Sequence, residues 1–588
     1  MLGLDDGDLS FGRAMSRSDL KLAFNLCALL VALALGFVLC LSPVKGGTVW
    51  SWASMGEVLA REGGFPRFEP GMAAPGGSLA FEHQGWLFGL LAYGLASLKQ
   101  QVSLGLLKAV LMVAAFAFCV ATGFRSRARP FSCAVFALAG LWASRSYFTD
   151  GPMLAGYACF SAALFMMEGE FWPAFFRRWV WLPLLAVAWL NLHLSALLLL
   201  PVALAWMLGE RGDPREAPAV PLFSKALYLA LLAGCFLLNP DGWRVFAEPL
   251  ALAGREARWL YGWSSPLAAN SFHDARPALL LMALALPLIL AGTWMEEGRE
   301  RLGRDILLFG LLASLALLSQ ALIPFFCLWL APVAATRATL LVDSLPGWLK
   351  ASRWPFKLAL LALAVLALPR AWSSPDFGFG TRLGDAPSQT LDLMREQGLS
   401  GVVFAPIEWS GWLQWQMKDQ ARLLVAPRAF DPGNARDYLE AMEAKPAVWP
   451  QVFERYGVGL ALLAPGSPLA VALSYSQDWQ PVAFDDASVL FAKAGPEHAD
   501  LIKTFAPRGL KPGDPARAID PSRLGQTEAD LEALAGRMAG VGRYHYYRAL
   551  LFQAEDEQDK VRQALEDGKS ADPGFALNAQ WLDYLAQH

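Results

Sequence analysis

The sequence lacks the short motifs that mark the catalytic centres of many soluble enzymes. It contains no glycine-rich phosphate-binding loop, no G-x-S-x-G and no H-E-x-x-H. Cysteine is also sparse, with seven residues, none of them after Cys327 and none in C-x-x-C spacing. A disulfide framework or a cysteine metal site is therefore not expected. The net charge of −3 gives no reason to expect a nucleic-acid partner.

Hydrophobic residues, by contrast, are abundant. They make up 55% of the 588 residues, and the excess over a soluble protein lies between residues 22 and 371. A membrane-spanning helix needs about 20 apolar residues. The pattern predicts a polytopic α-helical membrane protein with eleven spans, which lie near 22–43, 103–123, 130–144, 152–168, 179–192, 194–209, 222–238, 277–294, 305–323, 325–343 and 356–371.

The positions of lysine and arginine predict the orientation of these spans. With residues 1–21 in the cytoplasm, the basic residues at the helix ends fall on one side, and the C-terminal region lies on the outer face. The first apolar run is long enough to be an uncleaved anchor rather than a signal peptide. The basic groups are Arg13/Arg17/Lys21, Arg125/Arg127/Arg129, Arg177/Arg178, Arg211/Arg215, Arg299/Arg301/Arg304 and Lys350/Arg353/Lys357.

One short apolar stretch decides the count of spans. Residues 84–99 are interpreted as a helix at the outer surface, and the alternative is that they cross the membrane in place of another segment. The first outer loop then covers 44–102, which is unusually long, and long loops in compact proteins are usually functional or disordered. Together with this loop, residues 22–371 form the predicted membrane domain.

The C-terminal region alternates helix-like stretches with short apolar strands. This alternation predicts an outer, periplasmic α/β domain over 372–495, in which the last two strands form a pair. A Pro/Gly-containing linker is expected over 496–525. Residues 526–588 are expected to form short helices, in which one unit similar to a tetratricopeptide repeat is legible.

The polar residues predicted at the outer membrane boundary are the candidates for chemistry, because ionisable groups are costly there. In the first loop these are Glu69, Glu82 and His83, and the alternative for Glu69 is a solvated loop carboxylate. Asp150 precedes an apolar run that re-enters the membrane. It forms either part of a site or a surface ion pair with Arg145, which would contribute little.

Two further groups follow along the chain. Asn191 and His193 lie where two apolar runs meet, so they either line a wet cavity or hydrogen-bond between helices. Residues 239–242 are interpreted as a turn. Arg244, Arg255 and Arg258 lie beside tryptophans in the second outer loop, where they can hold a lipid phosphate through bidentate bonds or meet ordinary anionic lipid.

In their order along the chain, these features resemble the polyprenyl-phosphate-sugar-dependent membrane glycosyltransferases, the class that includes protein O-mannosyltransferases and aminoarabinose transferases. A first span, an acidic first outer loop and an Asp at a helix start are the shared pattern, and here they correspond to Glu69 and Asp150. Further resemblances to bacterial members are short stretches: His83 to Leu87, Trp189 to His193, Asn239 to Gly242 and Ser410 to Leu413. The sequence departs from the family pattern in having Glu at position 69 and no Arg-Pro near Asp150.

The resemblance implies an enzyme of a bacterial inner membrane that transfers a sugar from a lipid-phosphate donor to a protein or glycan acceptor. Glu69 would be the base, and the sugar would be inverted. Asp150 and His193 would orient the substrates, and one of the three arginines would stabilise the leaving phosphate. No cofactor is certain, although a divalent metal is possible. The competing hypothesis is a non-enzymatic transporter or assembly scaffold, although the internal symmetry typical of transporters is missing.

Overall fold

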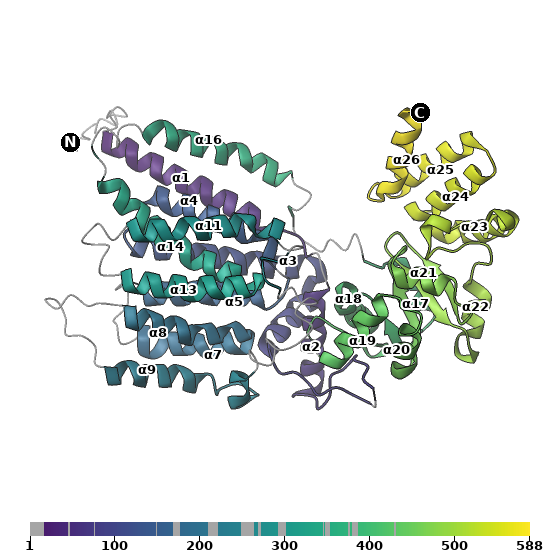
Figure 1. Cartoon of the computed structure of the whole chain (residues 1–588), viewed down its shortest axis with the longest axis horizontal. Coiled ribbons are helices and arrows are strands. Elements are labelled where there is room, and N and C mark those ends of the chain that lie inside the picture. The colour runs from purple at the N-terminus through teal and green to yellow at the C-terminus, as the bar shows by residue number, and fades with distance from the viewer. Residues whose placement is uncertain are drawn as a thin grey trace, which may run out of the picture.

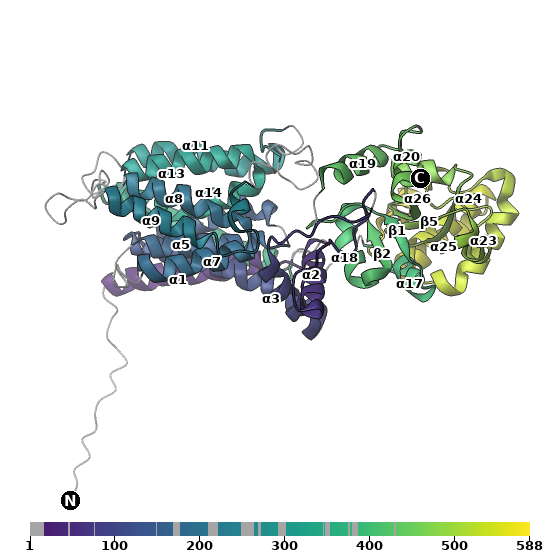
Figure 2. The same ribbon diagram turned by 90° about the horizontal axis from the view of Figure 1, so that it is seen from below.

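The computed structural model describes most of the chain. The described residues are 17–44, 47–75, 77–148, 150–168, 177–209, 222–247, 264–268, 272–291, 302–344, 346, 353–373, 377–378, 386–428 and 431–587. They form a helical bundle and a C-terminal domain, which we call the outer domain after its expected side of the membrane, and the two meet at the loop predicted as the first outer loop (Figures 1 and 2).

Long apolar helices lie side by side in the bundle (Figure 1). By length and composition, the segments Val102–Arg125, Asp274–Ala291 and Gln320–Ser344 are able to cross a membrane, and shorter apolar helices accompany them. The bundle helices are α1 (Arg17–Cys40), α3 (Trp86–Arg125), α4 (Pro130–Ser144), α5 (Met153–Met167), α7 (Leu182–Leu192), α8 (Leu199–Gly209), α9 (Leu222–Cys235), α11 (Phe272–Ala291), α13 (Leu302–Leu318), α14 (Ile323–Ser344) and α16 (Arg353–Trp372).

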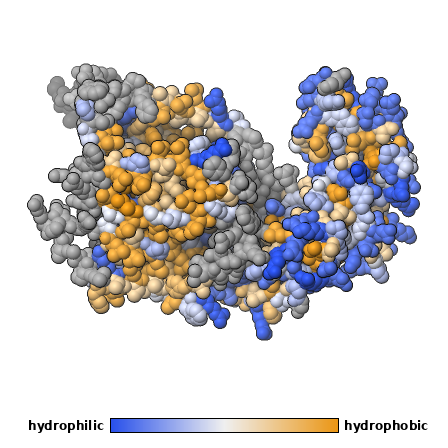
Figure 3. Space-filling model, in the orientation of Figure 1, coloured by the Kyte–Doolittle hydropathy of each residue, from blue (hydrophilic) through white to orange (hydrophobic). Residues whose placement is uncertain are grey.

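The bundle is apolar outside as well as inside. Leu30, Phe223 and Leu363 are 64–77% exposed on its surface. Hydrophobic residues predominate on the coloured part of the bundle face, whereas hydrophilic residues predominate on the outer domain (Figure 3). A helix that is hydrophobic all round suits a membrane rather than water. The described part of the chain is therefore that of a membrane protein with a water-exposed domain.

Helix α3 joins two segments that the sequence suggested were separate. It runs without interruption from Trp86 to Arg125, so the predicted surface helix and the following span are one element. Its 40 residues correspond to about 60 Å, whereas the hydrocarbon layer is about 30 Å thick. The first half of α3 therefore extends beyond the bundle, where it packs on α2 (Thr48–Glu62).

A five-stranded mixed sheet organises the outer domain, in the order β2-β1-β3-β5-β4. Strand β1 runs parallel to β2 and β3, and β5 runs antiparallel to β3 and β4. The predicted final strand pair is confirmed as β4 and β5. The strands are β1 (Gly401–Phe404), β2 (Ala421–Leu423), β3 (Val458–Leu463), β4 (Trp479–Phe484) and β5 (Val489–Lys493).

Helices cover both faces of this sheet, and the apolar faces of the sheet and helices form two cores. Turn residues hold their ends in place: Asp431 caps α19 by accepting a hydrogen bond from the Asn434 amide at 2.9 Å. The helices are α17 (Gln389–Glu396), α18 (Ile407–Met417), α19 (Pro432–Met442), α20 (Trp449–Tyr456), α21 (Pro468–Ser474) and α22 (Ala499–Phe505).

The predicted linker over 496–525 is wrong as a free connection. It contains α22, and Leu510 and Ala518 are buried in the core of the sheet domain. A Cβ added to Gly513 would lie 2.3 Å from the Ser474 hydroxyl, so this close approach requires glycine. Of the following helices, α23 (Leu524–Met538) and α24 (Gly542–Ala554) share this core. A second, smaller core joins α24 to α25 (Gln558–Ala571) and α26 (Ala576–Gln587).

Candidate functional site at the junction of bundle and outer domain

The first outer loop reaches the outer domain as a short ribbon. Its two sides pair through the Glu69 amide, which donates to the Leu79 carbonyl at 2.8 Å, and through a bridge between Phe68 and Ala80. Beyond the ribbon, the Leu423 amide donates to the Gly71 carbonyl at 2.9 Å, and the Ala73 amide donates to the Leu423 carbonyl at 2.8 Å. The loop thus pairs with the edge strand β2 and extends the sheet.

Helix α2 of the same loop packs closely on α18. A Cβ added to Gly411 would lie 1.9 Å from the Gly47 carbonyl oxygen, so a larger residue would force the two helices apart. The Trp50 ring lies 4.9 Å from that of Trp412. The stretch Ser410 to Leu413, which carried part of the family resemblance, therefore forms the surface on which the loop docks.

Glu69 lies inside this junction and is 4% exposed. Its carboxylate forms an ion pair with Arg428, which follows β2. Burial lowers the pKa of the Arg428 guanidinium to about 9, while the adjacent carboxylate favours its charged form. The Glu69 carboxylate is thus already engaged by a buried guanidinium, and this contact must break before the carboxylate can bind another group.

His83 meets the second outer loop. Its Nδ1 lies 2.7 Å from Oδ1 of Asp241, and the two side chains are 30% and 25% exposed. The His83 ring is also in edge contact with the Phe65 and Phe81 rings. A carboxylate at Nδ1 fixes the imidazole and directs Nε2 away from it, which is the arrangement that prepares a histidine to accept a proton.

The other polar side chain of this region is Asn191, at the end of α7. Its Oδ1 accepts a hydrogen bond from the Trp86 indole at 2.6 Å, and its Nδ2 donates to the Leu238 carbonyl at 2.9 Å. His193 accepts from the Ser195 amide at 3.0 Å and caps a 3-10 helix at Leu194–Leu198. The Asn191 bonds connect separate segments, as the packing alternative predicts, whereas the His193 bond is local to its own turn.

The predicted turn over residues 239–242 is confirmed. The Asn239 side chain accepts a hydrogen bond from the Asp241 amide at 2.8 Å and donates to the Gly242 carbonyl at 3.1 Å. This turn places Asp241 opposite His83. Two contacts therefore join stretches that are distant in sequence. His83–Asp241 joins the end of the first outer loop to the second outer loop, and Trp86–Asn191 joins the start of α3 to the end of α7.

Asp150 lies in a different place. It forms a buried ion pair with Lys108 of α3 at 2.5 Å, and Lys108 also donates to the Pro43 carbonyl at 3.4 Å. The predicted alternative of a surface pair with Arg145 is wrong, since Arg145 is exposed and Asp150 is bonded to Lys108. Asp150 thus ties the ends of α1, α3 and α5 together.

Of the three candidate arginines, the structure describes Arg244. It is exposed on a 3-10 helix, Gly242–Phe246, beside Trp243, which is 71% exposed. Arg244 follows Asp241 by three residues and so lies at the same outer end as His83. Arg255 and Arg258 fall outside the described residues.

A small polar pocket borders the Glu69–Arg428 pair, and both of these residues line it. Residues of α2, the loop and α18 line it, including Ser51, Glu57, Gln414 and Lys418. Within the described ranges no group of three or more His, Cys, Asp or Glu side chains lies close enough to hold a metal ion.

Sequence reasoning missed three partners. Lys108 was detectable, because a single lysine within an apolar run should have a partner. Asp241 was read as part of a turn, which it is, without its second role beside His83. Arg428 carried no local signal, because its partner Glu69 is 359 positions earlier in the sequence.

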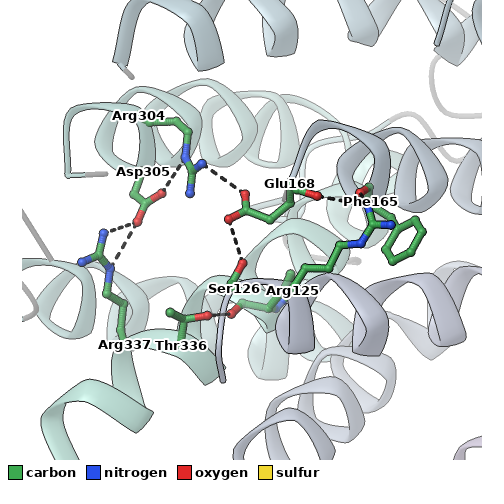
Figure 4. A network of polar contacts seen from close by, with 9 residues as sticks. Arg125, Ser126, Phe165, Glu168, Arg304, Asp305, Thr336 and Arg337 are labelled. Carbon is green, nitrogen blue, oxygen red and sulfur yellow. Dashed lines mark hydrogen bonds and ion pairs between the residues drawn. The ribbon is translucent and has the colours of Figure 1, made fainter. Parts of the chain in front are cut away.

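A second polar cluster lies at the opposite end of the bundle (Figure 4). Arg304 of α13 bonds Glu168 at 3.1 Å and Asp305 at 3.3 Å, and Arg337 of α14 bonds the other oxygen of Asp305. All four side chains are at most 8% exposed. The guanidinium of Arg125 donates to the Glu168 carbonyl at 3.1 Å, so this inner-end network joins α3, α5, α13 and α14.

Comparison with known proteins gives matches among solved structures. No protein-family model and no curated protein sequence matches the chain. The arabinofuranosyltransferase AftD from Mycobacteria is 17% identical with a TM-score of 0.46, and the match covers 82% of this chain and 42% of AftD. ArnT from Cupriavidus metallidurans, bound to undecaprenyl phosphate, is 13% identical with a TM-score of 0.47, and the match covers 82% of this chain and 99% of ArnT.

Proposed function

We propose that the chain is a membrane glycosyltransferase that moves a sugar from a polyprenyl-phosphate donor to an acceptor hydroxyl at the outer face of a bacterial inner membrane. The observation that carries the proposal is the His83–Asp241 pair. It lies where the apolar bundle meets the water-exposed domain, which is where a lipid-linked sugar and a water-soluble acceptor can both reach. The acceptor is a protein or a glycan.

The reaction needs a base, because a hydroxyl is a weak nucleophile. His83 Nε2 takes the proton of the acceptor hydroxyl, whose oxygen forms a bond to the anomeric carbon of the sugar. The bond from that carbon to the phosphate oxygen breaks on the opposite face, and the lipid phosphate leaves with the electron pair. The configuration at the anomeric carbon of the sugar is therefore inverted. Asp241 stabilises the imidazolium that forms.

Arg244 is the described candidate for stabilising the leaving phosphate, where negative charge grows in the transition state. Its exposed guanidinium on the 3-10 helix after Asp241 suits an anionic headgroup. The donor bond is already activated, so the proposed chemistry needs no nucleotide. A divalent metal, if one takes part, would assist at the same phosphate.

Glu69, the base that the resemblance implied, is the alternative to His83. Its contact with Arg428 must break before it can accept a proton, whereas His83 is already oriented and partly exposed. The variants His83→Asn and Glu69→Gln separate the two assignments. Both retain side chains of similar size, but Glu69→Gln also leaves the buried Arg428 without its charge partner, so rates are compared per folded protein.

The test is transfer from synthetic undecaprenyl-phosphate sugars, labelled in the sugar, by the purified protein in nanodiscs. With an extract of envelope glycans or proteins as the acceptor, the wild-type protein should produce labelled acceptor and release undecaprenyl phosphate. In His83→Asn the transfer rate should fall by about 10²- to 10⁴-fold. Wild-type rates in His83→Asn with loss in Glu69→Gln would move the base to Glu69. Full activity in both variants would exclude both residues as the base, and no transfer by the wild-type protein would leave the scaffold or transporter hypothesis.

We propose further that the chain crosses the membrane eleven times, with its N-terminus in the cytoplasm and the outer domain in the periplasm. Support comes from the arginines at the far end of the bundle, such as Arg125, Arg304 and Arg337, which agree with the positive-inside rule. In spheroplasts, an impermeant maleimide should label Glu528→Cys and not Arg127→Cys. The reverse labelling would overturn this orientation.

A further inference from the structure

Arg428 is the residue through which the outer domain reaches the candidate site. It follows the carboxyl end of β2 by five positions, and its side chain is 4% exposed. Among the described residues, the guanidinium makes three polar or cation–π contacts, and all of them are with the first outer loop. It pairs with the Glu69 carboxylate, donates to the Glu82 carbonyl at 3.1 Å, and lies over the Phe81 ring at 5.1 Å.

These contacts lie on both sides of the loop ribbon. Glu69 belongs to the first side and Phe81 to the second, and the Glu82 amide is 3.4 Å from Glu69 Oε2. The peptide groups of Glu82 are therefore held at both ends, by the Arg428 guanidinium at its carbonyl and by the Glu69 carboxylate at its amide. The next residue in the chain is His83.

We propose that Arg428 is a positioning residue, which fixes the backbone before His83 so that the imidazole meets Asp241 and the acceptor in one geometry. This inference rests on the proposed function, and it assigns the outer domain a part in the reaction itself. Arg428 contacts neither of the atoms between which the proton moves, which are His83 Nε2 and the acceptor hydroxyl oxygen. Its effect passes through the Glu82 peptide.

The chemistry of the contacts requires arginine. A guanidinium has several N–H donors in a planar fork, so it can serve a carboxylate and a carbonyl together and still lie flat over an aromatic ring. A lysine at this position keeps the charge and loses the fork. The conservative variant Arg428→Lys should therefore retain the ion pair with Glu69 and loosen the Glu82 carbonyl.

Hydrogen exchange of the full-length protein in nanodiscs tests the positioning independently of any reaction. In Arg428→Lys, the amides of residues 79–86 should exchange about tenfold faster than in wild type, because the local opening becomes easier. Arg455→Gln is the matched control, since Arg455 forms an exposed pair with Asp437 in the same domain. Its exchange over 79–86 should equal that of wild type.

Arg428→Gln leaves Glu69 buried without its charge partner and is liable to unfold. The double variant Glu69→Gln/Arg428→Gln removes both charges together and keeps the test possible. It should fold and show the same faster exchange over residues 79–86. Its exchange rates should be close to those of the single variants Arg428→Lys and Glu69→Gln, because the two residues act as one unit. Unchanged exchange in both Arg428→Lys and the double variant would overturn the proposal.

The sugar-transfer assay is the second test of the positioning role. In Arg428→Lys, kcat should fall by about 10- to 100-fold while KM for the undecaprenyl-phosphate sugar stays within about twofold, because misplacement of the base affects the chemical step. Faster exchange with unchanged kcat would overturn the positioning role. If the wild type transfers no sugar, the proposed function fails, and the exchange arm still decides whether Arg428 holds the loop.

Discussion

The two ends of the bundle hold their charges in different ways. At the inner end, Glu168, Arg304, Asp305 and Arg337 join helices to one another, and every one of these side chains is buried. At the outer end, the pairs His83–Asp241 and Glu69–Arg428 join a loop to another loop or to the outer domain, and the first pair is partly exposed. The inner end therefore contains a four-residue network that is buried throughout, whereas the outer end leaves the His83–Asp241 pair partly open to solvent.

The largest expected effect is at the inner end. Asp305→Ala leaves the guanidinium groups of Arg304 and Arg337 buried without their shared carboxylate, and breaking such a pair costs about 3–5 kcal/mol. Thermal unfolding in detergent should show a strongly destabilised or unfolded protein. Asp343→Asn is the control, because the Arg129–Asp343 pair at the same end is 47% and 43% exposed and should contribute at most about 1 kcal/mol.

At the outer end, the larger effect should be on activity and not on stability. Asp241→Asn keeps the turn, whose bonds come from the Asn239 side chain and the Asp241 backbone, but it removes the carboxylate that orients His83. Transfer should fall by at least about 100-fold, with a melting temperature close to that of wild type. A large drop in melting temperature would instead show that the pair serves stability.

A smaller effect is expected where the loop docks on the outer domain. Gly411→Val places side-chain atoms against the Gly47 carbonyl, which would lie 1.9 Å from a Cβ. Overpacking of this kind costs about 1–3 kcal/mol. Limited proteolysis of the first outer loop should become faster, whereas Gly459→Val in β3 should leave the loop unaffected. Equal proteolysis of wild type and Gly411→Val would argue against this docking.

The smallest effect concerns pH and the last helices. The pKa of Asp486 is raised from 3.8 to about 6, chiefly by burial and to a smaller extent by the neighbouring Asp572, against the lowering effect of the Arg543 and Gly542 amides. Because this pKa is raised in the folded state, the stabilisation is complete below pH 3.8 and is lost as the pH rises through about 6. Asp572→Asn should therefore stabilise α24 at pH 7 by less than about 1 kcal/mol, and hydrogen exchange of α24 at pH 5 and pH 7 measures it.

Local patterns predicted much of the fold. Apolar runs locate the bundle helices, and alternation of short apolar and amphipathic stretches locates the strands, because each property is carried by neighbouring residues. The continuity of α3 was missed, since the polar stretch around Lys99 suggested a break. The segment 496–525 was predicted as a linker from its proline and glycine content, but Gly513 allows a close approach to the Ser474 side chain instead.

The candidate site was predicted in its parts and not in its pairing. His83, Asn191 and the turn at 239–242 were each singled out by their place at the membrane boundary. Their partners depend on contacts between segments more than 100 residues apart, which no local pattern encodes. The proposed base moved from Glu69 to His83 because Glu69 is paired with Arg428, and no local pattern indicated this pairing, since Arg428 lies in another domain.

The strand contributed by Gly71–Ala73 has a consequence for how the protein can be divided. The outer sheet is completed by a piece of chain that belongs to the membrane half, so a fragment beginning at residue 386 would present β2 with a bare edge. Bare edges recruit strands from other molecules. The soluble fragment should therefore self-associate unless a peptide covering residues 67–81 is supplied, and the two halves of this protein are then one folding unit despite their different solvents.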